Sequence, residues 1–298
     1  MYDMEIVVRP GRYVVAVSGG VDSVALLHLL QTIPDIHLTV AHFDHGVRTD
    51  SAEDRRLVQE LSKVYGLPFV YHRKELGPNV SEDAARKARY AFLHHVRKAS
   101  GAQAIITAHH GDDLLETIIM NMLRGTGRRG LSSLKSTDVI RRPLLHVSKK
   151  ELLRYAEREG LRWREDSTNS DDRYVRNYIR KNIMPRFAEP DREALLAIAR
   201  RVAELNRTIE EQVVNYLHMQ PARTRLDRHS FIMLPHGVSR EVMGEWLLRN
   251  AEAELSKDML ERLTAAAKLG RSGSRVDING AYWLEIGKTY LALNERER

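Results

Sequence analysis

Two short polar stretches stand where apolar strand patterns give way to helical patterns. The first reads SGGVDS, at Ser18–Ser23, and the second reads TAHHGDDLLET, at Thr107–Thr117. Both contain residue types that bind anions, hold cations or transfer protons. Adjacent glycines cost backbone entropy on folding and bring no side chain to a core, so their position in the first stretch indicates a functional turn.

The first stretch has the composition of a phosphate-binding loop. At the start of a helix, unpaired backbone N–H groups and the helix dipole attract anions. Gly19 and Gly20 allow close approach to a phosphate, and the hydroxyls of Ser18 and Ser23 add uncharged donors. No lysine follows the second glycine, so the loop differs from those of ATPases that transfer the terminal phosphate. The predicted nucleotide-binding residues are Ser18, Gly19, Gly20, Val21, Asp22 and Ser23.

Asp22 is the unexpected member of this set, because a carboxylate repels a phosphate. A Mg²⁺ ion between the two groups would remove the conflict, so Asp22 is the predicted metal ligand. The alternative is that Asp22 only caps the helix N-terminus.

The second stretch also runs from a predicted strand into a predicted helix. Helical spacing places His109, Asp113 and Glu116 on one face, where they can act in acid–base chemistry or bind an ammonium group. A metal site built on His109 and His110 is the alternative, although neighbouring residues of an extended strand point in opposite directions.

A third candidate lies in SEDAARKARYAFL, where Ala85, Ala88 and Phe92 mark the buried side of a helix. Arg89 falls at the edge of this side, and an arginine there needs an anionic partner. Alternatively, its side chain only covers apolar surface.

The candidate residues lie in a chain whose predicted strands and helices alternate. The patterns predict strands at 12–17, 38–43, 68–72, 104–108 and 139–145, and helices at 22–30, 52–65, 82–98, 113–123 and 149–159. Such alternation predicts an α/β fold, a doubly wound, five-stranded parallel sheet, with both polar stretches beside the point where strand order reverses. Beyond Pro185 and Pro190 we expect a long helix from about Arg192 to Leu217. A small α+β unit of one strand, two helices and a hairpin-like run at 274–294 should follow. The predicted domains are 1–190, a helical linker at 191–220, and 221–298.

Composition narrows the function classes. The chain has 298 residues, no cysteine and a formal charge of +7, and 17 Lys and Arg face 8 Asp and Glu between Arg124 and Arg186. The absence of cysteine excludes thiolate nucleophiles and cysteine-bound clusters within this chain. No apolar run is long enough for a membrane span or signal peptide, so we expect a cytoplasmic protein without a membrane partner. The concentrated basic charge predicts a polyanionic partner, with an ordinary solvated surface as the alternative.

The motifs together resemble the tRNA(Ile)-lysidine synthetases, a branch of the adenylating PP-loop ATP pyrophosphatases. The resemblance rests on SGGVDS, AHFDHGVR, EDAARKARYAFL, AHHGDDLLETIIMNMLRGTGRRGL, RRPLL and EDSTNSDDRYVRNYIR. SGGVDS alone indicates the superfamily, whereas HHGDDLLET followed by LRGTGRRGL indicates this branch. The chain resembles the short form of the family, which lacks a last C-terminal domain.

The resemblance implies a two-step reaction with ATP and Mg²⁺. ATP would adenylate carbon 2 of the wobble cytidine of a CAU-anticodon isoleucine tRNA, and free L-lysine would then displace AMP to give lysidine. The resemblance implies that Asp22, Arg89, His109, Asp113 and Glu116 serve catalysis, and that the C-terminal domain binds tRNA.

Other classes remain open at this stage. An ammonia-using PP-loop ligase such as NAD synthetase would release pyrophosphate with a small acid rather than with tRNA. A tRNA-binding protein with an inactive nucleotide site would show no ATP–pyrophosphate exchange. The sequence leaves the oligomeric state open, a homodimer included.

Overall fold

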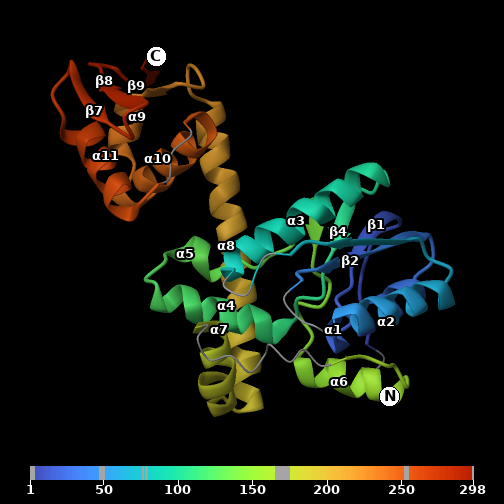
Figure 1. Ribbon diagram of the computed structural model, residues 1–298. Coiled ribbons are helices and arrows are strands. Elements are labelled where there is room, and N and C mark those ends of the chain that lie inside the picture. Colours follow the sequence, from blue (N-terminus) through green and yellow to red (C-terminus); the bar gives the residue numbers. More distant parts are fainter. Residues whose placement is uncertain are drawn as a thin grey trace. The chain divides into compact units, whose positions relative to one another are not determined.

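A computed structural model describes residues 4–46, 51–75, 77, 80–164, 175–251 and 255–296. The chain divides into two compact units, Met1–Ala203 and Glu204–Arg298 (Figure 1). None of the helices within these described ranges is long and apolar enough to cross a membrane.

The first unit is built on a parallel sheet, as predicted. Its strands are β1 (Gly11–Ala16), β2 (Ile36–Asp44), β3 (Phe69–Arg73), β4 (Ala104–Ile106) and β5 (Ile140–Arg141). Their order is β3-β2-β1-β4-β5, and every pairing is parallel. β1 therefore lies between β2 and β4, and the loops after β1 and β4 leave the sheet side by side at its carboxyl edge.

Helices and short turns connect these strands. The helices of the first unit are α1 (Val21–Gln31), α2 (Ser51–Val64), α3 (Glu82–Ala99), α4 (Gly111–Leu123), α5 (Arg128–Leu131), α6 (Lys149–Arg158), α7 (Val175–Tyr178), the π-helix η2 (Ile179–Ile183) and the 3₁₀-helix η3 (Met184–Arg186). The helix α8 (Glu189–His218) runs from the first unit into the second.

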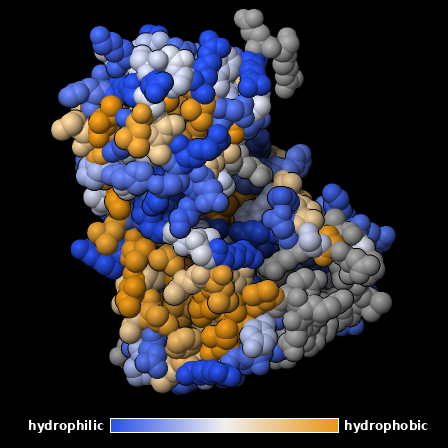
Figure 2. Space-filling model, turned by 90° about the vertical axis from the view of Figure 1, so that its left-hand side faces the viewer, coloured by the Kyte–Doolittle hydropathy of each residue, from blue (hydrophilic) through white to orange (hydrophobic). Residues whose placement is uncertain are grey.

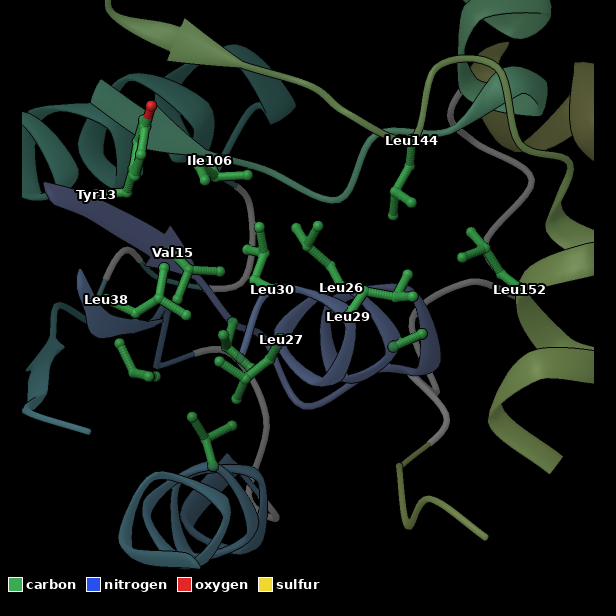
Figure 3. Close-up of a cluster of buried hydrophobic side chains, with 14 of the residues drawn as sticks. Tyr13, Val15, Leu26, Leu27, Leu29, Leu30, Leu38, Ile106, Leu144 and Leu152 are labelled. Atoms are coloured by element: carbon green, nitrogen blue, oxygen red, sulfur yellow. The ribbon is translucent and has the colours of Figure 1, made fainter. Parts of the chain in front are cut away.

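Alternate residues of β1 pack against opposite layers, which makes the sheet doubly wound. Val15 belongs to a cluster with α1, α2 and α6, shown in Figure 3, whereas Val14 packs with Leu93 and Val96 of α3. α1 is apolar nearly all round and eight of its residues are buried, as expected for a helix between the sheet and a second helical layer.

A separate helical layer supports α4. Leu114 packs with Leu196 and Ala199 of α8, and Leu115 packs with Ile179 and Met184. Apolar side chains also gather on one face in Figure 2, on the side where α4, α5 and α7 lie in Figure 1. In contrast to α1, this layer has exposed apolar residues, such as Met122, Leu123 and Val175.

Two predicted boundaries differ in the structure. The strand expected at 139–145 pairs only over Ile140–Arg141, because Pro143 has no amide hydrogen to donate to a ladder. The long helix expected from about residue 192 begins at Glu189 and includes Pro190 in its first turn, where proline is tolerated.

The second unit is a small α+β fold. Its elements are β6 (Arg225–Asp227), α9 (Arg228–Met233), α10 (His236–Asn250), α11 (Lys257–Leu269), β7 (Ser274–Asp277), β8 (Tyr282–Ile286) and β9 (Tyr290–Glu295). The antiparallel sheet has the order β6-β9-β8-β7, and Phe231, Trp246 and Leu284 lie in its core. The prediction of one strand, two helices and a hairpin-like run omitted α9, and the run forms three strands, β7, β8 and β9.

Candidate active site

The Ser18–Ser23 stretch forms the turn from β1 into α1. The Ser23 hydroxyl accepts hydrogen bonds from the amides of Ser18 (3.1 Å) and Gly19 (3.2 Å) and donates to the Gly20 carbonyl (2.9 Å). Gly19 has a φ of +99°, a conformation that side chains disfavour. Ser23 therefore braces the loop from inside, whereas the Ser18 side chain is exposed to solvent.

Two neighbouring segments hold this loop in place. The buried His42 ring bonds through Nδ1 to the Val17 carbonyl (2.8 Å). On the other side, the Arg164 amide donates to the Gly19 carbonyl (3.0 Å), and the Arg164 guanidinium bonds to Asp54 of α2 (2.8 Å). The loop is thus fixed from both flanks before any ligand arrives, a form of preorganisation.

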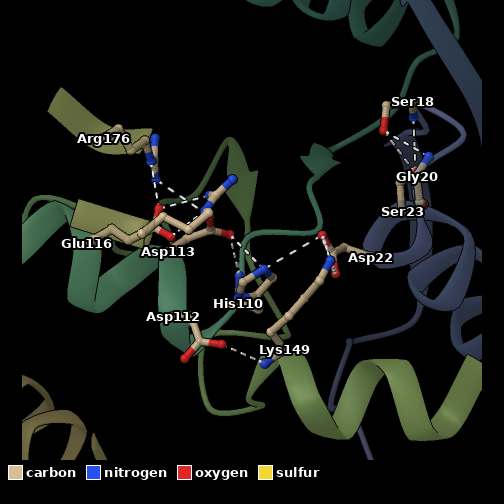
Figure 4. A network of polar contacts seen from close by, with 11 residues as sticks. Ser18, Gly20, Asp22, Ser23, His110, Asp112, Asp113, Glu116, Lys149 and Arg176 are labelled. Atoms are coloured by element: carbon tan, nitrogen blue, oxygen red, sulfur yellow. Dashed lines mark hydrogen bonds and ion pairs between the residues drawn. The ribbon is translucent and has the colours of Figure 1, made fainter. Parts of the chain in front are cut away.

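Asp22 points away from its own helix end. α1 has Gly20 at its N-cap and no side-chain cap hydrogen bond, so the capping alternative is not observed. The Asp22 carboxylate instead accepts two hydrogen bonds from Lys149 Nζ, at 2.7 and 2.8 Å, and lies 3.6 Å from His110 Nε2 (Figure 4). Burial alone would raise the pKa of Asp22, but His110 and Lys149 lower it to about 2.

His110 connects the two polar stretches. Its Nε2 is 3.4 Å from Asp113 Oδ2 and 3.6 Å from Asp22 Oδ2, and its amide donates to Asp113 Oδ2 at 3.0 Å. The residue is 5% exposed. Burial would lower the pKa of this imidazole, but the hydrogen bond to Asp22 and the charges of Asp113 and Asp22 raise it. The two carboxylates thus favour the protonated form of His110.

His109 has the opposite electrostatic character. Its Nδ1 bonds to the Thr107 hydroxyl (2.8 Å), and burial lowers its pKa to about 3, with Asp113 opposing and Arg142 and Arg89 adding to the shift. The neutral form therefore prevails near pH 7. Arg89 is half-buried near enough to His109 to influence its charge.

Glu116 and Asp113 form an acidic pair that arginines already occupy. Glu116 is 1% exposed and accepts from Arg176 Nε (2.9 Å), Arg180 Nε (2.7 Å) and Arg180 Nη2 (2.9 Å). Asp113 Oδ1 lies 3.5 Å from Arg180 and 3.6 Å from Arg176. Burial would raise the pKa of Asp113, but the charges of His110 and Arg176 and the hydrogen bond from the His110 amide lower it.

The first residue of α6 contacts Asp22 of α1 and Asp112 of α4. This residue is Lys149, following a capping box formed by Ser148 and Glu151, and the Lys149 amide donates to Asp112 Oδ2 (2.9 Å). A lysine at the positive end of a helix is unfavourable unless a carboxylate faces it. The position of Lys149 directly after the predicted cap Ser148 could have indicated that this lysine has a carboxylate partner.

The sequence argument thus found part of the network. The structure brings together Asp22, Asp113 and Glu116 through four further residues: His110, Lys149, Arg176 and Arg180. The sequence argument had named His110 only in the alternative metal site and had not selected the other three. Arg176 and Arg180 are four residues apart on one helical face, which could have indicated a shared anionic partner. Within the described ranges, no group of three or more His, Asp or Glu side chains could hold a metal, and so a two-histidine metal site finds no support.

The fold and this loop define a PP-loop protein. The model of the PP-loop domain family matches residues 4–187. The structure is similar to the U34-tRNA thiolase NcsA from Methanococcus maripaludis, with a TM-score of 0.54 and 18% identity, covering 65% of this chain and 73% of that chain. At this identity the likeness shows the fold alone.

Comparison with curated relatives shows to which family of PP-loop proteins the chain belongs. A tRNA(Ile)-lysidine synthase of Thermotoga sp. (strain RQ2) is 35% identical over 304 aligned positions, covering 94% of this chain and 69% of that protein. That of Geobacter sulfurreducens is 38% identical over 223 residues, which cover 68% of this chain. The chain belongs to the tRNA(Ile)-lysidine synthase family. Its match spans about half the length of several curated relatives, 47% for the Geobacter protein.

Proposed function

We propose that this protein ligates free L-lysine to carbon 2 of the wobble cytidine of CAU-anticodon isoleucine tRNA, with ATP cleaved to AMP and pyrophosphate. Membership of the family supports this proposal. The structural observation that carries it is the continuous network from Asp22 in the PP loop, through His110, to Asp113 and Glu116 in α4. The PP loop and the acidic pair thereby lie at one edge of the sheet.

The triphosphate of ATP is proposed to lie at the N-terminus of α1. The tight turn at Gly19 and the first-turn amides of α1 offer a site for an anion, and Lys149 supplies a nearby positive charge. Arg164 and His42 keep the loop in this conformation.

Asp22 fits a Mg²⁺ ion that takes most of its ligands from phosphates and water. Mg²⁺ in nucleotide enzymes is often held by only one or two protein carboxylates. The low pKa of Asp22, about 2, keeps this ligand ionised. Lys149 now occupies both Asp22 oxygens, so it must share or release the carboxylate when the cation arrives. The ion would neutralise charge that develops on the phosphates.

In the first step, oxygen 2 of the cytidine attacks the α-phosphorus, and the bond from that phosphorus to the bridging oxygen of pyrophosphate breaks. The protein's contribution is placement and charge stabilisation, without a covalent enzyme intermediate. This fits a chain that contains no cysteine. Lys149 and the protonated form of His110 lie beside Asp22 and can stabilise the negative charge that accumulates there.

In the second step, the side-chain amine of free lysine attacks carbon 2, and the bond from carbon 2 to the AMP oxygen breaks. The amine must lose a proton, and neutral His109 or the carboxylate of Asp113 can accept it. The low pKa of His109, about 3, makes it a weak base that would not hold a proton for long. Asp113 is the better candidate for binding the ammonium group. Arg89 contributes positive charge beside His109.

The tRNA is proposed to bind the basic stretch from Arg124 to Arg186, and the second unit is proposed to supply discrimination between tRNAs. Phosphate contacts give affinity without sequence information, so selection between tRNAs that share an anticodon needs further contacts.

An incorporation assay tests this function. The protein is incubated with ATP, radiolabelled L-lysine and unmodified CAU-anticodon transcripts of isoleucine and methionine tRNA. We expect label in the isoleucine transcript alone, with one pyrophosphate released per lysine. Pyrophosphate release driven by a small carboxylic acid and ammonia, without tRNA, would contradict the proposal.

A further inference from the structure

The acidic pair in α4 is closed to an incoming ammonium group. Both oxygens of Glu116 and one oxygen of Asp113 have arginine nitrogens within 3.6 Å. The other Asp113 oxygen accepts from the His110 amide at 3.0 Å. A carboxylate offers about four lone-pair positions, so this pair is nearly saturated. Free lysine can reach it only if a guanidinium leaves.

Arg180 is the arginine whose departure opens the pair. Among the described residues, it makes two of the three hydrogen bonds to Glu116, whereas Arg176 makes one; both arginines lie within 3.6 Å of Asp113 Oδ1. The Arg180 side chain is 39% exposed, compared with 21% for Arg176 and 2% for Glu116. Its guanidinium therefore has a route to solvent that the carboxylate lacks.

The segment that carries Arg180 is suited to a polyanion. Val175–Arg186 contains Arg176, Arg180, Lys181 and Arg186 but no acidic residue. The segment passes through the π-helix Ile179–Ile183, a rare conformation that is frequent at functional sites. An RNA phosphate bound at this segment would compete with Glu116 for the guanidinium, because arginine binds both groups in the same two-pronged geometry.

We propose that, in the protein without RNA, the guanidinium of Arg180 occupies the position that an ammonium group of free lysine takes during catalysis, and that an RNA phosphate draws it away. This inference rests on the proposed function. Guanidinium and ammonium each carry one positive charge, so the exchange keeps the buried carboxylates neutralised throughout. Arg176 remains on Glu116 as the second counter-charge.

The exchange couples the binding of RNA to the binding of free lysine. Arg180 and free lysine cannot both occupy the oxygens between Asp113 and Glu116, so RNA binding, which withdraws Arg180, should strengthen lysine binding. By thermodynamic reciprocity, free lysine must also tighten RNA binding by the same factor. The exchange would weaken the binding of free lysine to Asp113 and Glu116 until a tRNA is bound.

Equilibrium binding of radiolabelled L-lysine to the wild-type protein, without ATP, tests this coupling directly. We expect CAU-anticodon isoleucine tRNA to increase lysine affinity at least about 10-fold, a coupling within the usual range for linked sites. Equal lysine affinity with and without tRNA would overturn the inference. This comparison needs no variant and is decisive even if a variant does not fold.

Matched variants identify the residue responsible. R180Q should bind free lysine without tRNA, with an affinity that approaches that of the wild-type complex. R200Q removes the same kind of charge from an exposed position of α8, outside the proposed RNA-binding stretch, and should retain the dependence on tRNA. An R180Q protein that is folded but still needs tRNA to bind lysine would contradict the assignment.

The incorporation assay separates this inference from the proposed function. If wild-type protein forms lysidine but binds lysine independently of tRNA, only the exchange is wrong. If it forms no lysidine with ATP and tRNA present, the function itself is wrong.

Discussion

The carboxylate of Asp22 shows how single residues define this site. It is held by Lys149, which is remote in sequence, and lies beside His110, rather than capping its own helix. Asp22 could serve only as a structural ion-pair partner of Lys149, or it could also bind the cation of the nucleotide. Substitutions of Asp22 and of Lys149 distinguish these two roles.

Asp22→Asn and Lys149→Gln break the same ion pair. Both should lower the free energy of unfolding by a similar amount, about 0.5–1 kcal/mol, because both side chains are partly exposed. Asn is a poor ligand for a hard cation, so Asp22→Asn should also reduce tRNA-dependent pyrophosphate release by at least about 100-fold. The loss in Lys149→Gln should be about tenfold smaller. Equal losses of activity would favour a structural ion pair.

His109 gives the site a specific acid sensitivity. Its pKa is lowered from 6.5 in the unfolded chain to about 3 in the folded protein, so between these values the unfolded chain binds one more proton. Stability from this group is therefore complete above pH 6.5 and falls as the pH decreases toward 3, by about 1.4 kcal/mol per pH unit.

His109→Gln should remove this slope. In urea denaturation, the decrease in unfolding free energy from pH 7 to pH 5 should be about 2 kcal/mol smaller in the variant than in the wild type. His95→Gln, at an exposed position of α3, is the control and should leave the slope unchanged. An unaltered slope in His109→Gln would show that His109 is not buried in its neutral form.

At the scale of elements, the site depends on where α4 begins. The Gly111 amide donates to the Val147 carbonyl (2.8 Å), which ties the first turn of α4 to the segment before α6. A Cβ atom on Gly111 would lie 3.1 Å from that carbonyl and 3.2 Å from Leu196. The close approach positions Asp112 and Asp113, so glycine is required for packing here.

Gly111→Ala should therefore displace the start of α4. We expect a loss of about 1–3 kcal/mol in unfolding free energy, as for other overpacked positions, and slower lysine transfer. Gly127→Ala is the matched control, because a Cβ there meets no atom within 4 Å and its φ of −73° suits alanine. A Gly111→Ala protein as stable and active as Gly127→Ala would contradict this role.

Several elements could be predicted from the sequence because their patterns are local. The β1–loop–α1 unit follows from an apolar strand, two glycines and an apolar helix. The parallel, doubly wound sheet followed from the alternation of elements. β5 was predicted too long because apolar residues around Pro143 pack without pairing. Arg176 and Arg180 were missed because their partner, Glu116, lies some sixty residues earlier, and only the fold brings them together.

At the scale of the molecule, α8 belongs to both compact units. Their division at residues 203 and 204 falls within this helix. Leu196 and Ala199 pack against Leu114 beneath the acidic pair, so the catalytic unit needs the first part of α8. The domain boundary near Pro190 and the tRNA-binding role of the second unit remain predictions.

Truncation tests both ideas. A chain ending at Ala203 should fold and bind ATP but lose its discrimination between isoleucine and methionine tRNAs. A chain ending at Pro190 should be less stable by at least about 2–5 kcal/mol, the usual cost of removing one buried leucine side chain. Thermal denaturation and filter binding measure these properties. Full tRNA selectivity in the chain ending at Ala203 would remove the proposed role of the second unit.

The central claim is that one site first adenylates the tRNA and then transfers lysine. It is tested most directly by incubating the protein with CAU-anticodon isoleucine tRNA and ATP labelled on its α-phosphate, without lysine. We predict label bound covalently to the tRNA, which leaves as AMP when L-lysine is added while lysidine appears in the same molecules. Labelled AMP that forms only with lysine already present, and never on tRNA, would contradict the account.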